Sequence, residues 1–235
     1  MKRVPIIRPA HSHPCGYFSD RAANNDYLHP DIKPDTELLT LLNLSGFRRS
    51  GMNIYRPSCP GCHACVSVRI PTRRFKLKRR FRRTVKALRN WQLSVEKPSL
   101  SHYPIYERYI NARHSDGSMF PPSAKEFQQF LISGYDTGHF LVAREDGVAK
   151  AVLVFDRFLD GLSSVYCFFD PDIEHVSPGT FMIINLTLLA RALDLEYHYL
   201  GYWVDGCEKM SYKQNFEPLQ YYIDKNWDEL PPQEF

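Results

Sequence analysis

The stretch Tyr55–Arg89, YRPSCPGCHACVSVRIPTRRFKLKRRFRRTVKALR, organises the chain because it joins a cysteine cluster to a cationic block. Cys59, Cys62 and Cys65 are evenly spaced, three positions apart. Residues 69–89 then contain eleven Lys or Arg and no acid. Closely spaced thiols indicate local order where side-chain packing alone is weak, and clustered cations indicate a polyanionic partner.

The composition is that of a globular protein of one large or two small domains. The chain has 235 residues, 43% of them hydrophobic, and a net charge of +4. Acids gather elsewhere, for example at Asp224, Asp228, Glu229 and Glu234, so the charge is asymmetric. The N-terminus does not resemble a signal peptide, and no apolar run is long enough to span a membrane. Six cysteines without an export signal indicate thiols or metal ligands, and a cytoplasmic protein.

Hydrophobic periodicity and turn residues predict the order of elements. Residues 1–34 are rich in Pro, Asn, Asp and His, and we expect them to be irregular. The expected helices are 36–44, 78–91, 102–114, 123–133, 178–193 and 207–216. The expected strands are 53–56, 64–70, 92–96, 139–144, 149–155, 162–169, 196–203 and 219–223.

This order predicts an α/β (α+β) protein in two parts. Three successive strands, a buried helix, and then strand, helix and strand are typical of an acetyltransferase-like (GNAT) domain. The clearest boundary is Lys97-Pro98. We therefore expect a smaller cysteine-containing α+β region over residues 1–97 and a transferase-like domain over residues 98–235.

The cationic block predicts an amphipathic helix that binds nucleic acid. Phe81, Val85, Leu88 and Trp91 recur at helical spacing, and Lys or Arg fill the other faces. A merely solvated face would normally interleave acids with the cations. RNA is favoured over DNA because no helix-turn-helix or zinc-finger spacing is present.

The cysteine spacing predicts either a structural metal site or a loop held by free thiols. Two residues between cysteines allow a turn to direct both sulfurs at one ion, as in zinc sites and part of an iron–sulfur run. Cys15 or His63 would supply a fourth ligand. Cys167 and Cys207 have no such partners and are expected to be buried as small apolar residues.

Two further motifs lie in the second half. A strand that ends at Asp170-Pro171 is followed by a helix beginning near Gly179 and Thr180, whose free N–H groups suit the polarisation of a carbonyl. An ordinary strand–turn–helix would have the same spacing. Lys209 and Lys213 are one helical turn apart, so we expect them to share a face, either binding a carboxylate or phosphate or simply solvated.

Together these residues resemble the aminoacyl-tRNA–protein transferases over nearly the whole chain. The N-terminal resemblance rests on Pro14-Cys15-x-Tyr17, the Tyr55–Val66 motif and the Arg-rich stretch. The C-terminal resemblance rests on Ser164–Pro171, Gly179-Thr180, Leu200–Trp203 and Cys207–Lys213. The cysteine spacing, and Phe18 where eukaryotic arginyltransferases have a second cysteine, make the chain more similar to the bacterial members, which transfer leucine. Ser177-Pro178-Gly179 replaces the usual Ser-Leu-Gly.

The resemblance implies transfer of leucine from leucyl-tRNA to the α-amino group of proteins that begin with Asp or Glu, which marks them for N-degron degradation. It implies that Tyr166, Asp170 and Tyr202 lie near the acceptor amine, with Asp170 as a proton acceptor. The implied substrate-binding residues are Lys209, Tyr212, Lys213, Gly179 and Thr180. The implied tRNA-binding residues are Arg79, Arg80, Arg82 and Arg83, and the candidate metal ligands are Cys15, Cys59, Cys62 and Cys65. The chemistry requires no cofactor, since the ester is already activated; a structural zinc or iron–sulfur cluster is a separate expectation.

Three alternatives remain at this point. The first is an arginyl-tRNA–protein transferase of the same fold. The second is a coenzyme-A-dependent N-acetyltransferase, which needs a glycine-rich turn led by a basic residue, whereas residues 176–180 contain one glycine and no basic lead. The third is a metal-stapled RNA-binding protein without catalysis.

Overall fold

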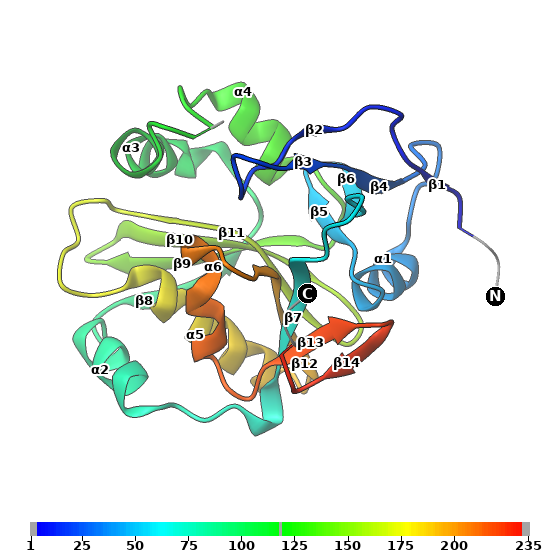
Figure 1. Cartoon of the computed structure of the whole chain (residues 1–235). Helices are drawn as coiled ribbons and strands as arrows, with labels where there is room; N and C mark the ends of the chain where they lie inside the picture. The colour runs from blue at the N-terminus through cyan, green and yellow to red at the C-terminus, as the bar shows by residue number, and fades with distance from the viewer. Residues whose placement is uncertain (1–3, 118, 232–235) are drawn as a thin grey trace.

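The computed structural model, which describes residues 4–117 and 119–231, is a mixed α/β fold around one large mixed sheet (Figure 1). Within those ranges the sheet has eight strands in the order β14-β13-β7-β12-β11-β10-β9-β8. The strands are β7 (Cys65–Pro71), β8 (Gln92–Glu96), β9 (Gly138–Glu145), β10 (Val148–Arg157), β11 (Gly161–Phe169), β12 (Tyr197–Val204), β13 (Gln220–Ile223) and β14 (Asn226–Asp228).

The middle of the sheet is an antiparallel meander followed by a parallel crossover. β9 and β10 are joined by Asp146 and Gly147, which both have positive φ as a tight hairpin turn requires. After β11, helix α5 (Pro178–Ala192) carries the chain to β12, which runs parallel to β11. The parallel pairing covers only Gly161–Ser163 against Tyr197–Tyr199. Beyond these residues the two strands are not paired, so the sheet parts there.

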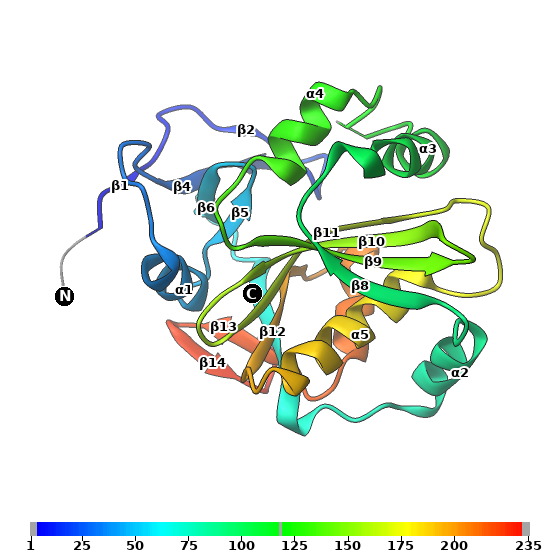
Figure 2. The same ribbon diagram turned by 180° about the vertical axis from the view of Figure 1, so that it is seen from behind.

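Helices cover both faces of the sheet, as Figures 1 and 2 show. On one face α5 packs with α2 (Arg79–Ala87) over β9, β10 and β11. On the other face α3 (Tyr103–Arg113) and α4 (Ala124–Phe127) bury Ile110 and Phe127 against Val152 and Val154. β10 is buried on both sides because residues 151–155 form a continuous apolar run whose successive side chains enter the two clusters in turn.

A second, smaller sheet is built from the N-terminal region, and this corrects the expectation that residues 1–34 are irregular. Its order is β1 (Ile6–Ile7), β4 (Asn25–Leu28), β6 (Asn53–Pro57) and β5 (Arg48–Ser50), and β2 (His13–Pro14) pairs separately with β3 (Ala22–Ala23). Helix α1 (Thr36–Leu44) packs beside it, capped by Asp35, whose carboxylate accepts the N–H of Leu38 at 2.8 Å. Strand β6 was predicted over 53–56, whereas β1 to β5 were missed because two to four residues are too short to show a period.

The other predicted elements are confirmed, with differences at their ends. The helix expected over 78–91 ends at Ala87, and the one over 123–133 is α4 followed by a π-helical turn over Gln128–Ile132. The helix over 207–216 is α6 (Glu208–Ser211) followed by a 3-10 turn over Tyr212–Asn215. Strand β14 was not predicted.

The predicted mixed α/β class is confirmed. Strands β7 and β8 precede residue 97 and yet join the same sheet as the strands that follow it. The functional division at residue 97 stays a prediction. Within the described ranges, none of the helices is at once long enough and apolar enough to cross a membrane.

Candidate active site

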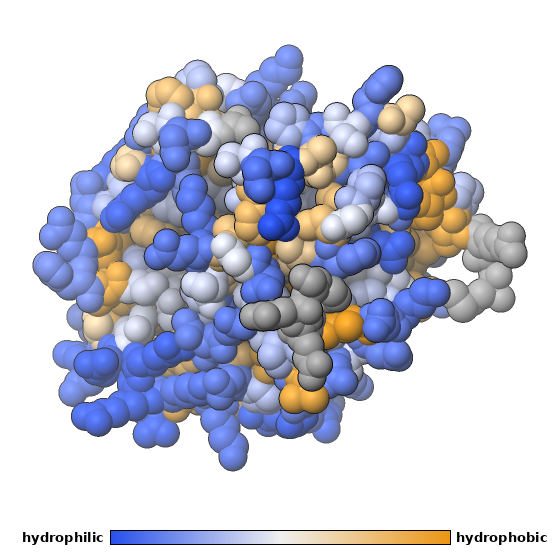
Figure 3. Space-filling model, viewed as in Figure 1, coloured by the Kyte–Doolittle hydropathy of each residue, from blue (hydrophilic) through white to orange (hydrophobic). Residues whose placement is uncertain are grey.

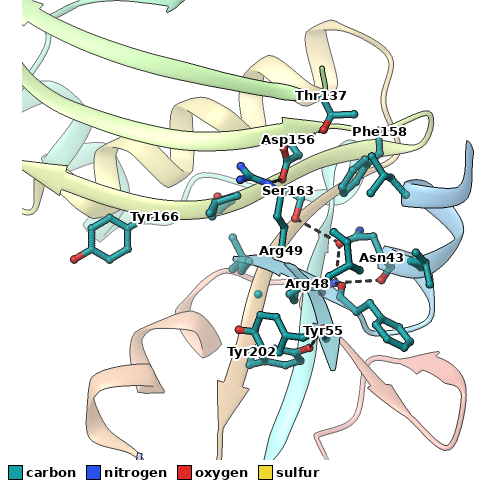
Figure 4. A pocket seen from close by; sticks show the side chains of 18 of the residues that line it. Asn43, Arg48, Arg49, Tyr55, Thr137, Asp156, Phe158, Ser163, Tyr166 and Tyr202 are labelled. Atoms are coloured by element: carbon teal, nitrogen blue, oxygen red, sulfur yellow. Dashed lines mark hydrogen bonds and ion pairs between the residues drawn. The ribbon is translucent and has the colours of Figure 1, made fainter. Parts of the chain in front are cut away.

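A cavity of about 240 Å³ lies where β11 and β12 part (Figure 4). One wall comes from residues 163–166 of β11 and 200–202 of β12. The opposite wall comes from the smaller sheet and α1, through Asn43, Arg48, Arg49 and Tyr55. Segments far apart in the chain therefore enclose one pocket, which we call the central pocket.

A buried ion pair joins the two walls. Arg49 Nε donates to Asp156 Oδ2 at 2.7 Å, and the two side chains are 5% and 2% exposed. Thr137 also donates to Asp156, over 3.1 Å. Figure 4 shows the Arg49 guanidinium turned toward Asp156. This pair connects β5 to β10 and leaves Asp156 neutralised, so its carboxylate is not free to attract a cation.

Arg48, by contrast, has no carboxylate partner among the residues that the structure describes. It is 7% exposed, and its Nη1 donates to Asn43 Oδ1, Asn43 O and Phe47 O at 2.7, 3.1 and 2.7 Å. Its Nε and Nη2 are buried and make no hydrogen bond. Burial lowers the pKa of Arg48, although an arginine remains charged at neutral pH. The central pocket thus contains a buried cation with unused donors.

Tyr202 lies in the wall of the central pocket, as its predicted place near a substrate requires. Its hydroxyl donates to the carbonyl oxygen of Gly46 at 2.8 Å, and its ring centroid is 6.0 Å from that of Tyr55. Burial raises the pKa of Tyr202 well above its usual value. The phenol is therefore neutral and holds the smaller sheet against β12.

Lys213 also lies in the central pocket, whereas Lys209 and Tyr212 are exposed and do not line it. The change from α6 to a 3-10 turn at Tyr212 separates the two lysines, so the expectation that they share a face is wrong. Lys213 Nζ donates to the carbonyl oxygen of Tyr202. Burial, and then repulsion from Arg48, lower the pKa of Lys213 to about 7.

Tyr166 and Asp170 lie at different places relative to β11. Tyr166 lines the central pocket, and its buried hydroxyl has no hydrogen-bond partner within residues 4–117 and 119–231. Burial raises the pKa of Tyr166, so its hydroxyl is neutral. Asp170 follows the strand, outside the pocket lining, and is bound by Lys150 at 3.2 Å and Arg108 at 3.0 Å. Burial alone would raise the pKa of Asp170, but the hydrogen bond from Lys150 and the nearby cations lower it.

Gly179 and Thr180 lie in the first turn of α5, as predicted, but they do not line the central pocket. Ser177 caps this helix: its Oγ accepts the N–H of Thr180 at 3.4 Å and donates to the Thr180 hydroxyl at 2.8 Å. The structure therefore does not bring these two residues together with Tyr202 and Lys213 in one cavity.

The predicted cationic helix is confirmed in its amphipathic form. Phe81 is buried and stacks on Phe216 with ring centroids 4.9 Å apart. The exposed side chains are cationic, and among the described residues they make no ion pair with an acid: Arg79, Arg80, Arg82, Arg83, Lys86 and Arg89. In Figure 3 the region of α2 is covered by hydrophilic side chains.

The four predicted metal ligands line a separate pocket. Cys15, Cys59, Cys62 and Cys65 all face it, together with Arg21, whose Nη1 donates to Cys62 Sγ at 3.5 Å. Four thiols are a donor set that suits zinc or an iron–sulfur cluster. Within residues 4–117 and 119–231, however, no three His, Cys, Asp or Glu side chains are grouped closely enough to hold a metal ion.

Sequence reasoning missed the residues that give the central pocket its charge. Arg48 and Arg49 stand in Phe47-Arg48-Arg49-Ser50, next to a tight turn, and look like surface cations. Their burial follows from the contact between the two sheets, which no local period encodes. The one available signal was an arginine pair without an acid within several positions on either side.

Comparison with known proteins identifies matching families over most of the chain. The family profile described as "Arginine-tRNA-protein transferase, N terminus" matches residues 13–83, and that described as "Arginine-tRNA-protein transferase, C terminus" matches residues 101–223.

Several curated relatives named "Aspartate/glutamate leucyltransferase" match at similar levels. The protein from Hahella chejuensis is 42% identical, covering 96% of this chain and 97% of its own. The protein from Chromohalobacter salexigens is 41% identical, covering 92% and 89%. The protein from Pseudomonas aeruginosa is 39% identical, covering 92% of both.

Two solved structures show a weak likeness to this chain. L-PGS from Bacillus licheniformis is 12% identical with a TM-score of 0.43, covering 59% of this chain and 46% of that one. The C-terminal domain of a putative lysylphosphatidylglycerol synthetase from Agrobacterium fabrum is 16% identical with a TM-score of 0.40, covering 71% and 52%.

Proposed function

This chain belongs to the arginine-tRNA–protein transferase family and is a transferase enzyme, and from this premise we propose that it moves leucine from leucyl-tRNA to the α-amino group of proteins that begin with Asp or Glu. The leucine becomes a destabilising N-terminal residue, so the product enters an N-degron pathway. The bacterial relatives named above carry this activity in their names.

The observation that carries the proposal is the charge of the central pocket. Four charged side chains line it, and Arg49 and Asp156 neutralise each other. Arg48 remains as a buried cation without an acidic partner among the described residues, and Lys213, whose pKa burial lowers to about 7, adds a second positive charge when it is protonated. An acceptor with an acidic first residue supplies the missing negative charge, whereas a basic one would be repelled.

The reaction follows from ordinary ester aminolysis. The neutral α-amine attacks the carbonyl carbon of the aminoacyl ester, a peptide bond forms, and the ester bond to the tRNA 3′ hydroxyl breaks. The amine gives up one proton and the departing oxygen gains one. Because the ester is activated and an α-amine has a pKa of about 8, the protein must chiefly position the two reactants and stabilise the oxyanion.

We keep Tyr166, Asp170 and Tyr202 as the proposed catalytic group. Tyr202 and Tyr166 are supported by their places in the wall of the central pocket and by neutral hydroxyls. Asp170 has weaker support as a proton acceptor, since two cations already hold its carboxylate and lower its pKa.

Lys213 is the best supported of the proposed substrate-binding residues, because it lies in the central pocket. For Lys209, Tyr212, Gly179 and Thr180 we propose contact with the 3′ end of the tRNA, outside the pocket. Gly179 and Thr180 are partly exposed in the first turn of α5, and the N-terminus of a helix suits a polar or anionic group.

We further propose an acetyltransferase-like domain, with tRNA bound along α2. The topology supports the domain: an antiparallel meander, helix α5, and a parallel strand β12 that parts from β11 next to the pocket. The unpaired cations Arg79, Arg80, Arg82 and Arg83 support phosphate contacts on α2. A tRNA partner in turn supports a cytoplasmic location.

A structural zinc or iron–sulfur cluster held by Cys15, Cys59, Cys62 and Cys65 stays part of the proposal. It is supported by four thiols that face one pocket, and it takes no part in the transfer. Elemental analysis of protein purified without added metal tests it, because an occupied site would contain zinc or iron in proportion to protein.

The test of the donor is a competition between two aminoacyl-tRNAs. We expect label from leucyl-tRNA, but not from arginyl-tRNA, to appear on a peptide that begins with Asp or Glu. Transfer from arginyl-tRNA instead would replace the donor and keep the fold and reaction. Folded protein that binds tRNA tightly and transfers neither amino acid would favour a non-enzymatic RNA-binding role.

A further inference from the structure

We propose that Arg48 is the receptor for the side-chain carboxylate of the acceptor protein's first residue. This inference deepens the proposed function and rests on it, since it concerns the specificity of the same pocket. Arg48 belongs to β5 of the smaller sheet, so the proposal gives that sheet a direct part in substrate choice.

Arg48 has unused hydrogen-bond donors in the interior of the protein, where buried donors normally have partners. The side chain is more than nine-tenths buried, and Nη1 is anchored by three oxygens of Asn43 and Phe47. Nε and Nη2 make no hydrogen bond within the described residues. These two nitrogens form one edge of the guanidinium, which is the edge that binds a carboxylate through two parallel hydrogen bonds.

The guanidinium of Arg48 is held in place by neighbouring side chains before any ligand binds. The ring centroids of Tyr199 and Tyr202 lie 5.5 and 5.8 Å from its central carbon. Asn43, which accepts from Arg48, is itself buried and also accepts from Ser163 at 3.5 Å. A guanidinium that is already fixed loses little conformational entropy on binding, so it can select a ligand with the geometry of a carboxylate.

No side chain that lines the central pocket neutralises the charge of Arg48. The one acid among the lining residues, Asp156, is already paired with Arg49. Lys213 cannot offset the charge of Arg48 either, because a lysine is neutral or positive, and repulsion from Arg48 helps to lower its pKa. An isolated buried charge is costly, and a bound carboxylate removes that cost.

The size of the cavity favours an amino-acid side chain over a nucleotide. Its volume is about 240 Å³, below the roughly 300–1,000 Å³ of pockets that hold drug-sized ligands. Aromatic and aliphatic side chains such as Phe47, Tyr55 and Leu200 form much of the rest of the lining. The cationic surface of α2 lies elsewhere in the molecule and is the better site for phosphates.

The experiment compares peptides that differ only in charge, with leucyl-tRNA at saturation. Peptides beginning with Glu and Gln, and with Asp and Asn, are offered to the wild type and to Arg48→Gln. We expect the wild type to prefer the acid in kcat/KM by roughly a thousandfold. In Arg48→Gln we expect this ratio to fall to about tenfold or less, with the KM for leucyl-tRNA unchanged.

Two further variants make the comparison specific. Arg56→Gln is the matched control, because Arg56 lies in the neighbouring strand but pairs with Asp26 and does not line the central pocket. Arg48→Lys keeps the positive charge but loses the pair of parallel hydrogen bonds to a carboxylate. We therefore expect its Glu-to-Gln ratio of kcat/KM to lie between those of the wild type and Arg48→Gln. If Arg48→Gln fails to fold, Arg48→Lys carries the test: a Glu-to-Gln ratio equal to that of the wild type overturns the proposal.

The remaining outcomes are distinguishable. A folded Arg48→Gln protein with the wild-type ratio overturns the role of Arg48. So does a variant whose KM for leucyl-tRNA rises while the ratio is kept, since Arg48 would then bind the tRNA. Equal loss of transfer to both peptides indicates a structural role. A wild type that transfers leucine to neither peptide contradicts the proposed function itself.

Discussion

At the scale of single residues, the central pocket is defined by charged side chains that are buried rather than solvated. Arg49 and Asp156 are linked across the two sheets, whereas Arg48 and Lys213 have no acidic partner in the described parts of the chain. Burial makes each of these charges expensive unless another group compensates it. Substitutions at these positions therefore change stability or specificity by amounts that can be measured.

The Arg49–Asp156 pair should behave as a buried ion pair. Arg49→Met leaves Asp156 buried and unpaired, so we expect the free energy of unfolding to fall by roughly 3–5 kcal/mol. The double variant Arg49→Met, Asp156→Leu should recover most of that loss, because it removes both charges. Urea unfolding measures all three proteins. A single variant within about 1 kcal/mol of the wild type would show that the pair is solvated.

Lys213 should make stability depend on pH. Its amine is neutral in the folded protein above about pH 7 and charged in the unfolded chain up to about pH 10.4. Between these values the unfolded state binds one more proton, so the free energy of unfolding rises with pH. From pH 7 to 9 we expect the wild type to gain roughly 2 kcal/mol relative to Lys213→Met. Lys209→Met, an exposed control, should follow the wild type; equal slopes in all three proteins would refute the shift.

At the scale of elements, the helical spacing of the apolar residues in α2 leaves the cationic residues on its exposed face. Phe81 is buried, Val85 is partly buried, and both pack toward the core, so every exposed position of the helix except Ala87 carries a cation. This helix could be predicted because its apolar residues recur at helical spacing. The short strands β1 to β5 could not, since their pairing is set by residues distant in the chain.

The α2 arginines should determine the salt dependence of tRNA binding. Replacing Arg79, Arg80, Arg82 and Arg83 by Gln should weaken binding and reduce the slope of log affinity against log salt by roughly 3. Binding is measured by anisotropy over a series of KCl concentrations. The control removes the same charge from other exposed positions: Lys33, Lys97, Lys125 and Arg157. If the two quadruple variants bind alike, α2 has no special role.

The part of the sheet beside the pocket is also joined by a buried histidine. His198 of β12 lies 2.8 Å from the Ser164 hydroxyl of β11 and 2.8 Å from that of Thr187 in α5. Burial lowers the pKa of His198 to about 3. The folded protein therefore holds this ring neutral while the unfolded chain protonates it below about pH 6.5.

The consequence is acid sensitivity that depends on His198. The free energy of unfolding should fall as the pH drops from 6.5 toward 3, because the unfolded state binds the extra proton. His198→Phe should be less stable at pH 7 by roughly 1–3 kcal/mol, since two hydroxyls lose their partner, and the deficit should shrink by pH 4.5. His11→Gln, an exposed control, should not change this trend. A deficit that is constant with pH would contradict the account.

At the scale of the whole molecule, the site arises where two sheets from different parts of the chain meet. The meander, α5 and β12 could be predicted from alternation, turns and a long apolar run. Tyr202 and Lys213, which the sequence suggested as candidates, both line the central pocket, and their contact with substrate stays a prediction. Arg48 could not be found in the sequence, because its surroundings, Asn43 of α1 and Tyr199 and Tyr202 of β12, come together only in the folded protein.

The central claim is that this arrangement joins leucine to the α-amino group of an acidic N-terminus. The most direct measurement is mass spectrometry of a small protein that begins with Glu, after incubation with leucyl-tRNA and this enzyme. We predict one added leucine at the N-terminus, and none on the same protein with an acetylated N-terminus or with Ala in place of Glu. Absence of any addition to the Glu-started protein, or addition to lysine side chains, would contradict the account.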